Sequence, residues 1–130
     1  ATQFGYEPGQ IPQLGVLAFM ADSSLREAGV KCCMQVNPDI GVHVGRVLTG
    51  DQFVSSKDKK KWLYETFQGV CTEMEGAAIA QAAYLNQVPF LIVRAISDKA
   101  DDSAQMDYEE FERMAIVHSV NLTRALIAAV

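Results

Sequence analysis

Three clusters of polar residues interrupt apolar stretches of this sequence. They are Thr49-Gly50-Asp51-Gln52-Phe53, Thr72-Glu73-Met74-Glu75 and Arg94-Ala95-Ile96-Ser97-Asp98. Each cluster follows a segment that is expected to be a strand, and functional side chains gather in such places more often than on helix surfaces. Each cluster could instead be a helix cap or a satisfied turn. The three clusters are therefore the first candidates for binding or catalytic chemistry.

The third cluster combines a cation, a hydroxyl and a carboxyl. Arg94 ends an apolar run, and a cation in a buried place needs a partner or a ligand. Asp98 directly follows Ser97, whose hydroxyl could hold the carboxyl in one orientation. A carboxyl in a dry cleft has a raised pKa and can act as a general acid near neutral pH. The alternative is that Ser97 or Asp98 caps a short turn.

The second cluster places two carboxylates at the start of an Ala-rich segment. Glu73 and Glu75 flank Met74, and negative charge at that place suits the dipole of a helix N-terminus. A carboxylate also accepts two hydroxyl hydrogen bonds at once, as recognition of a ribose diol requires. The sequence alone does not choose between these roles. In the first cluster, Phe53 follows a polar turn, where an aromatic ring either stacks on a flat ligand or packs in the core.

The elements that must position these clusters alternate between helix and strand. We predict helices over 24–34, 56–67, 76–85 and from 108 to the C-terminus, with capping boxes at Ser24/Glu27 and Asp107/Glu110. We predict strands over 40–45, 69–72 and 88–93, the last of them buried on both faces. Such alternation is typical of an α/β fold with a mostly parallel sheet. Sheets of this kind bind ligands beyond the carboxyl ends of their strands.

Composition narrows the classes of function. The net charge of −5 argues against nucleic-acid binding, which usually needs a basic face. No apolar run approaches the ~18 residues of a membrane span, and we expect no signal peptide. The three cysteines are odd in number and lack the Cys/His spacing of a zinc site, so we expect no metal and reduced thiols in a cytoplasmic protein. We interpret His43 and His118 as structural residues.

Together the clusters resemble those of the methylthioadenosine/S-adenosylhomocysteine nucleosidases, within the purine nucleoside phosphorylase superfamily. The matching segments occur in family order and span nearly the whole chain: Phe4-Gly5-Tyr6-Glu7 through Pro12, Gly50-Asp51-Gln52-Phe53, Glu73-Met74-Glu75 and Val93-Arg94-Ala95-Ile96-Ser97-Asp98. The resemblance implies a three-layer αβα phosphorylase/hydrolase-like fold. It also implies hydrolysis of the N-glycosidic bond of methylthioadenosine and S-adenosylhomocysteine, without a metal or an organic cofactor.

The resemblance assigns the chemistry at the purine to particular residues. Asp98 should protonate adenine N7 as the general acid, and Ser97 should orient Asp98. Phe53 should stack on the purine, while the backbone of Val54 should read its Watson–Crick edge. Arg94 should help to position the attacking water.

The remaining roles concern the sugar and the alkylthio group. Glu75 should hold the ribose hydroxyls with Met74 packed against the sugar, and Glu73 is counted with them as substrate-binding. Tyr108 should line the alkylthio end of the pocket. A homodimer is implied, because three residues of the opening segment should reach the pocket of the neighbouring subunit: Phe4, Tyr6 and Pro12.

The chain departs from the family in one respect, because the N-terminal half with the water-activating glutamate is not present. We therefore interpret residues 1–130 as the C-terminal part of a single nucleosidase domain, a fragment that needs the N-terminal half of the same protein. Two other functions stay open. One is a related purine-nucleoside phosphorylase or a futalosine-type hydrolase, and the other is a non-catalytic adenosine-binding fragment. The preferred thio-nucleoside is not determined by the sequence.

Overall fold

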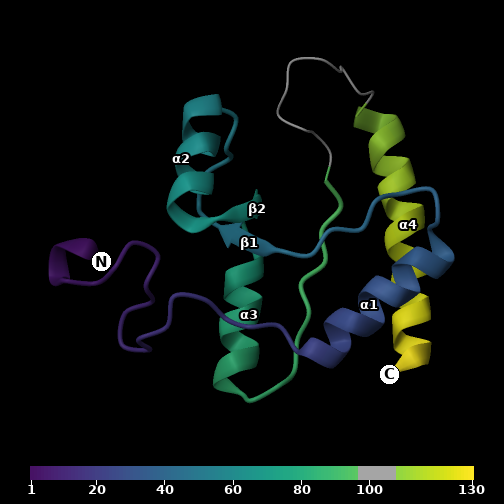
Figure 1. Cartoon of the computed structure of the whole chain (residues 1–130), viewed down its shortest axis with the longest axis horizontal. Helices are drawn as coiled ribbons and strands as arrows, with labels where there is room; N and C mark the ends of the chain where they lie inside the picture. Colours follow the sequence, from purple (N-terminus) through teal and green to yellow (C-terminus); the bar gives the residue numbers. More distant parts are fainter. Residues whose placement is uncertain (97–107) are drawn as a thin grey trace.

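The computed structural model of the chain describes residues 1–96 and 108–130. Ser97, Asp98 and the predicted cap Asp107 lie outside the described residues. The elements follow one another along the chain as drawn in Figure 1. They are the short 3₁₀-helix η1 (Thr2–Phe4), α1 (Ser23–Val36), β1 (Arg46–Thr49), α2 (Lys57–Phe67), β2 (Gly69–Glu73), α3 (Gly76–Leu85) and α4 (Tyr108–Ala129).

The two strands of the described residues form a parallel sheet. Arg46 of β1 lies opposite Gly69 of β2, and Thr49 lies opposite Glu73 at the carboxyl end. The strands are connected by α2, as a parallel pair requires, because a tight hairpin can join only antiparallel strands. This β-α-β unit confirms the predicted α/β class and the parallel direction of the sheet.

The helices begin and end where local capping satisfies their terminal backbone groups. Helix α2 has Ser56 as its cap, which accepts a hydrogen bond from the Lys59 amide at 3.4 Å, and α3 covers the predicted range 76–85. Helix α1 instead is capped by Asp22, whose side chain accepts from the Leu25 amide at 2.9 Å. The predicted cap Ser24 is therefore wrong, because α1 starts at Ser23 and Ser24 already lies inside it.

Two predicted strands are not strands in the structure. Residues 40–45 carry no ladder, and Val42 instead packs against the small core between α1 and α4. Among the described residues, 88–93 pair with no strand, and their backbone bonds reach two helix ends: Asp22 N to Phe90 O at 2.9 Å and Val88 N to Ala83 O at 2.9 Å. A strand requires a neighbouring strand for its backbone groups, and the described residues place none beside this segment. The expected burial on both faces is wrong too, since Val88 and Val93 are exposed.

The core of the described residues lies where α1 crosses α4 (Figure 1). Cys32 and Cys33 of α1 pack with Leu122 of α4. The Asn37 side chain at the end of α1 is only 1% exposed and donates to the His118 carbonyl of α4 at 3.0 Å. This bond links the two helices and gives the buried amide of Asn37 a partner, as a buried polar group requires.

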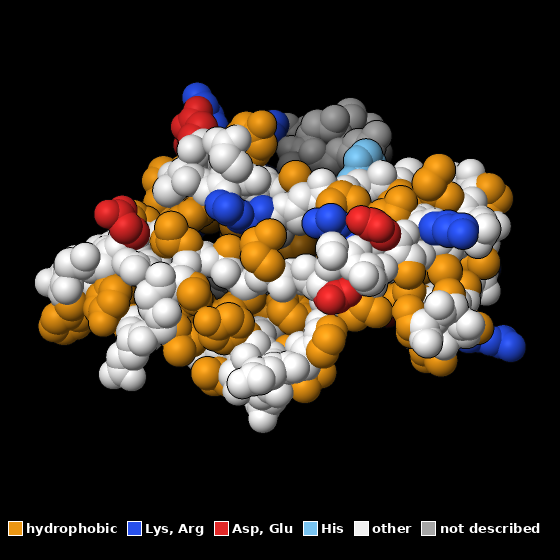
Figure 2. All heavy atoms as spheres, turned by 60° about the horizontal axis from the view of Figure 1, so that its bottom comes forward, with side chains coloured by type: hydrophobic (Ala, Val, Ile, Leu, Met, Phe, Trp, Pro, Cys, Tyr) orange, Lys and Arg blue, Asp and Glu red, His pale blue; other side chains and the backbone are white. Residues whose placement is uncertain are grey.

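Many large apolar side chains lie outside that core. Figure 2 shows hydrophobic side chains spread over one face of the molecule, on both sides of a band that carries Lys, Arg, Asp and Glu side chains. Met20, Ile127 and Leu17 are among those exposed. A monomeric protein rarely leaves so much apolar surface in contact with water. No helix among the described residues is both long and apolar enough to cross a membrane.

Candidate functional site

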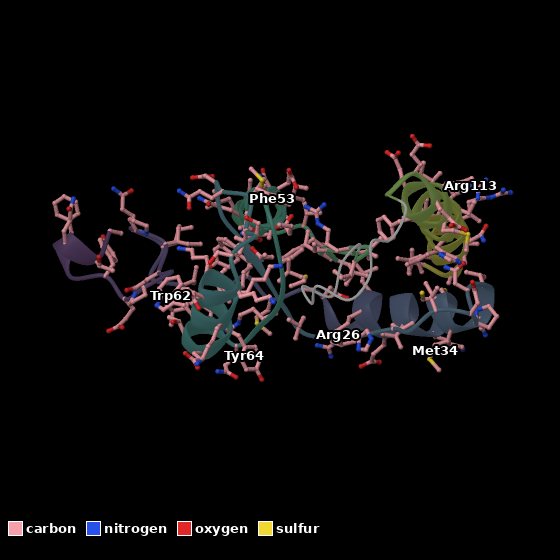
Figure 3. The ribbon with its side chains drawn as sticks, turned by 90° about the horizontal axis from the view of Figure 1, so that it is seen from above. Arg26, Met34, Phe53, Trp62, Tyr64 and Arg113 are labelled. Carbon is pink, nitrogen blue, oxygen red and sulfur yellow. The ribbon has the colours of Figure 1, made fainter. Side chains whose placement is uncertain are left out.

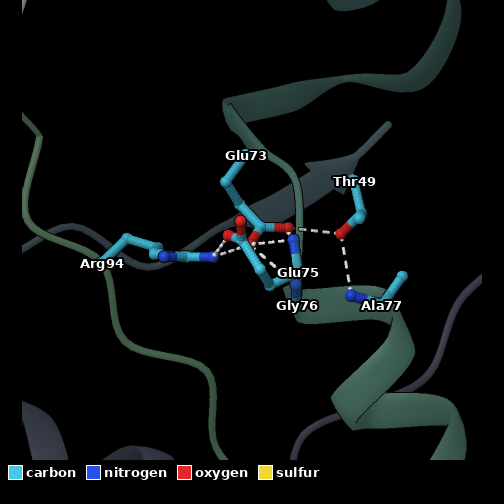
Figure 4. A network of polar contacts seen from close by, with 6 residues as sticks. All are labelled: Thr49, Glu73, Glu75, Gly76, Ala77 and Arg94. Atoms are coloured by element: carbon cyan, nitrogen blue, oxygen red, sulfur yellow. Dashed lines mark hydrogen bonds and ion pairs between the residues drawn. The ribbon is translucent and has the colours of Figure 1, made fainter. Parts of the chain in front are cut away.

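Polar side chains from several separate segments of the chain meet at the carboxyl end of the parallel sheet. β1 ends with Thr49, β2 ends with Glu73, and α3 begins immediately after Glu75. Arg94 approaches from the unpaired segment that follows α3, as Figure 4 shows. Residues that are far apart in the sequence thus form one network of hydrogen bonds and ion pairs.

Glu73 lies at the centre of this network, and its side chain is only 9% exposed. Its two carboxylate oxygens accept the Gly76 amide at 3.0 and 2.7 Å, and Oε2 also accepts the Glu75 amide at 3.1 Å. The Thr49 hydroxyl donates to Oε1. Glu73 therefore satisfies the first free N–H groups of α3, and its negative charge suits the positive end of the helix dipole.

Arg94 joins the two glutamates. Its Nη2 forms an ion pair with Glu73 Oε2 and a second with Glu75 Oε2 at 2.6 Å. The Arg94 side chain is 34% exposed and the Glu75 side chain 65% exposed. The cation that the sequence places after an apolar run thus has two carboxylate partners, and most of the Glu75 carboxylate stays open to a ligand.

The structure therefore separates two roles that the sequence leaves open. The Glu73 carboxylate is occupied by the start of α3, by Thr49 and by Arg94. The Glu75 carboxylate has Arg94 as its partner among the described contacts and faces solvent. An exposed carboxylate held by a guanidinium can still accept hydrogen bonds from a diol.

Cys71 lies on β2 behind this network, and burial raises the pKa of its thiol. The positive charge of Arg94 opposes that effect and pulls the same pKa down. Burial has the larger effect, so the thiol stays protonated at neutral pH. Cys71 is therefore not an activated nucleophile, because nucleophilic cysteines have lowered pKa values.

The loop after β1 carries Phe53 and Val54. The Phe53 ring is 83% exposed, so both of its faces are available for stacking on a ligand. Figure 3 places Phe53 and Tyr64 of α2 on opposite sides of the molecule. Val54 is partly buried and lines an open hollow with Lys59 and Leu63 of α2.

The other predicted site residues are not gathered at the network. Met74 is half-exposed between the two glutamates, and Tyr108 begins α4, although its side chain lies outside the described part. The opening segment extends away from the strands in Figure 1. It carries the three residues predicted for a neighbouring pocket, of which Phe4 and Pro12 are exposed and Tyr6 is partly buried.

Two contributors to the network have no role predicted from the sequence. Thr49 belongs to the first cluster, but its bond to Glu73 depends on the register of β1 and β2. Gly76 is buried because its amide lies against the Glu73 carboxylate, where a Cβ atom would come within 2.9 Å of Oε1. The sequence places Thr49 in the first polar cluster and Gly76 at the start of the predicted helix 76–85, and these positions are the only signal that could have indicated them.

The chain is similar to proteins of one known family in both sequence and structure. The model of the phosphorylase superfamily matches residues 1–130. A 5'-methylthioadenosine/S-adenosylhomocysteine nucleosidase of Exiguobacterium sp. is 39% identical over 129 residues, which are 96% of this chain and 53% of that protein. The nucleosidase of the same name from Staphylococcus aureus is 39% identical, over 98% of this chain and 55% of its own length. The chain thus spans about half the length of the relatives it matches.

Solved structures agree in fold over nearly the whole chain. The nucleosidase of Neisseria meningitidis in complex with methylthio-immucillin-A is 34% identical with a TM-score of 0.84, and the match covers 99% of this chain and 55% of that one. The Campylobacter jejuni nucleosidase is 30% identical with a TM-score of 0.87, at 99% and 55% coverage. A futalosine hydrolase of Helicobacter pylori is 28% identical with a TM-score of 0.83, at 99% and 54% coverage. The parallel β-α-β unit, the acidic and arginine network at its carboxyl end and these matches together show that the chain belongs to the phosphorylase superfamily.

Proposed function

We propose that this chain provides the larger part of the substrate site of a nucleosidase. That enzyme hydrolyses 5'-methylthioadenosine and S-adenosylhomocysteine and releases adenine. The observation that carries the proposal is the pairing of Arg94 with an exposed Glu75 at the carboxyl end of parallel strands. Ligands bind at that end of α/β sheets. The 39% identical relatives named for this activity support the choice of substrate.

In this proposal Glu75 accepts hydrogen bonds from the ribose hydroxyls, and Met74 packs against the sugar. Glu75 is suited to this role because its carboxylate is exposed, whereas Glu73 is occupied by the backbone of α3. As the glycosidic bond breaks, positive charge develops on the sugar, and a nearby carboxylate stabilises it. Arg94 holds the Glu75 carboxylate and helps to orient the attacking water.

The purine is held by Phe53 and by the backbone of Val54, and Asp98 supplies the proton for its departure. Water attacks the anomeric carbon of the sugar, and the bond from that carbon to adenine N9 breaks. Adenine leaves with a proton on N7 donated by Asp98, which Ser97 orients. The proton lost by the water passes to a carboxylate of the N-terminal half.

The surface of this chain also has places where that N-terminal half could pack. The relatives are nearly twice as long, and the unpaired segment 88–93 together with many exposed apolar side chains leaves surface for another polypeptide. We propose that the N-terminal half covers it, and that the completed protein is a cytoplasmic homodimer. Tyr108 would line the alkylthio end of the pocket, and the opening segment would close the neighbouring subunit's pocket through three residues: Phe4, Tyr6 and Pro12.

The test uses the completed protein, meaning this chain together with its N-terminal half. Adenine release from 5'-methylthioadenosine is followed by chromatography in buffer with and without inorganic phosphate. We expect release at the same rate in both buffers. Strict dependence on phosphate would overturn hydrolysis in favour of phosphorolysis. Binding of the nucleoside without release of adenine would instead indicate a non-catalytic adenosine-binding module.

A futalosine-type hydrolase is the second candidate, because the Helicobacter pylori enzyme matches 99% of the chain with a TM-score of 0.83. Futalosine is therefore the competing substrate in the same assay. A higher kcat/KM for futalosine than for 5'-methylthioadenosine would show that the futalosine-type hydrolase is the correct assignment. We expect the opposite order, since the 39% identical sequence relatives are thio-nucleosidases.

The role of Asp98 has a separate test. Asp98→Asn in the completed protein should lower kcat about a thousandfold, because an amide cannot donate an acidic proton. KM should change little, because the amide keeps the shape of the side chain. Asp58→Asn, on the exposed first turn of α2, is the matched control and should leave kcat unchanged. A kcat of Asp98→Asn within tenfold of the unchanged protein would exclude Asp98 as the acid.

A further inference from the structure

We infer that Thr49 is a positioning residue for the ribose end of the substrate, acting through Glu73 on Glu75 and Arg94. This inference rests on the proposed function and adds to it a residue on a different strand from the two glutamates. Thr49 itself faces Glu73 and the start of α3, so its effect on a substrate passes through those groups.

The parallel register brings Thr49 to Glu73. The two residues lie opposite one another as the last paired residues of β1 and β2. The Gly50 amide donates to the Glu73 carbonyl at 3.1 Å, which extends the backbone pairing by one bond beyond the strands. The Thr49 side chain is therefore fixed at the point where both strands give way to loops.

The Thr49 hydroxyl donates one hydrogen bond and accepts another. Its O–H donates to Glu73 Oε1, and its oxygen accepts the Ala77 amide of α3 at 2.8 Å. A hydroxyl has one donor and two acceptor positions, so one group can serve both bonds. Bonds in such a chain polarise one another and strengthen together. Serine could form the same two bonds, whereas valine has the same shape and forms neither.

These bonds fix the Glu73 carboxylate, which in turn fixes two groups of the proposed site. Glu73 holds the backbone amide of Glu75 at 3.1 Å and forms an ion pair with Arg94, which reaches Glu75 Oε2 at 2.6 Å. Without the Thr49 hydroxyl, Glu73 Oε1 loses one donor and the Ala77 amide loses its acceptor. The direction of the Glu75 carboxylate is then less well defined. Among the described contacts, none of the hydrogen bonds and ion pairs of this network involves Phe53 or Val54, although Val54 lines the same hollow as Thr49.

The test compares Thr49→Val and Thr49→Ser in the completed protein. Calorimetry measures the Kd of adenine and of the tight-binding analogue methylthio-immucillin-A, and steady-state kinetics measures KM and kcat for 5'-methylthioadenosine. We expect Thr49→Val to weaken analogue binding and raise KM about tenfold, the effect of one lost hydrogen bond to a buried charged group. Adenine should bind as before, and Thr49→Ser should restore the analogue affinity to within about threefold.

Thr123→Val is the matched control, since it also removes a hydroxyl, one that donates to the Ser119 carbonyl of α4 at 2.8 Å. An equal loss of adenine and analogue affinity in Thr49→Val would overturn the inference in favour of a general effect on folding. A serine variant as weak as the valine variant would overturn it too.

Amide hydrogen exchange in the unchanged protein gives a readout that needs no variant. The Ala77 amide should be protected because it is bonded to Thr49, and an unprotected amide there would contradict the inference. An unchanged protein that releases no adenine would instead refute the proposed function. The two failures are therefore distinguishable.

Discussion

Glu73 and Glu75 are separated by one residue, yet the structure predicts opposite results when each is changed to glutamine. In Glu73→Gln the amide nitrogen replaces an oxygen that accepts backbone N–H groups at the start of α3. It also places a neutral donor beside Arg94, where a negative charge stood. In Glu75→Gln the change falls on an exposed carboxylate that pairs with Arg94 among the described residues.

The size of the Glu73 effect follows from its contacts. A hydrogen bond to a charged group contributes about 1.5–3 kcal/mol, and the Gly76 and Glu75 amides together would lose about 3 kcal/mol because one acceptor oxygen remains. The ion pair with Arg94 adds at most about 1 kcal/mol, since the guanidinium is partly exposed and screened by water. The expected loss of stability is therefore about 3–4 kcal/mol, or about 10 °C in Tm for a protein of the relatives' size. Glu75→Gln should lose less than about 1 kcal/mol.

The assay is urea unfolding of the completed protein, followed by circular dichroism, together with KM for 5'-methylthioadenosine. Glu73→Gln should unfold at lower urea concentration, whereas Glu75→Gln should unfold like the unchanged protein but show a raised KM. Glu65→Gln is the control for loss of a surface charge, because Glu65 forms an exposed ion pair with Lys61 on α2. Equal stability of the Glu73 and Glu75 variants would refute the division of roles between the two carboxylates.

Two further predictions concern the same end of the sheet. Gly76→Ala should destabilise the protein by about 1–2 kcal/mol in urea unfolding, although alanine favours helices. Its Cβ would lie 2.9 Å from Glu73 Oε1, an oxygen that Thr49 binds in a carboxylate that Arg94 holds through Oε2. Gly50→Ala, whose Cβ would have nothing within 4 Å, is the control, and a stabilised Gly76 variant would contradict the packing. Burial raises the pKa of the Cys71 thiol, so its alkylation rate, followed by mass spectrometry, should still be rising above pH 9. The thiol of the unfolded chain loses its proton at lower pH than the folded one, so this group lowers the stability as the pH rises above its ordinary pKa. An alkylation rate that levels off below pH 9 would contradict the raised pKa.

Local sequence determined most of the helices. The helices predicted over 56–67 and, from the Ala-rich run before Asn86, over 76–85 are both present, because a helix is built from bonds between residues four apart. The family and the α/β class follow from the clusters and the alternation of elements. The cap of α1 was misplaced because Asp22 and Ser24 both suit a helix start, and only the backbone conformation at Asp22 decides between them.

Tertiary structure decided what depends on distant partners. The apolar segment 88–93 has the composition of a buried strand, but the described residues provide no strand beside it, and pairing needs a partner as well as a propensity. The same reason applies to the two glutamates, whose types and spacing fit both a helix cap and a ribose ligand. The register of β1 against β2 brings Thr49 to Glu73, and the path of the chain brings Arg94 to both carboxylates. The sequence by itself determined that Glu73, Glu75 and Arg94 are site candidates, while only the fold decided which carboxylate is occupied and which stays open.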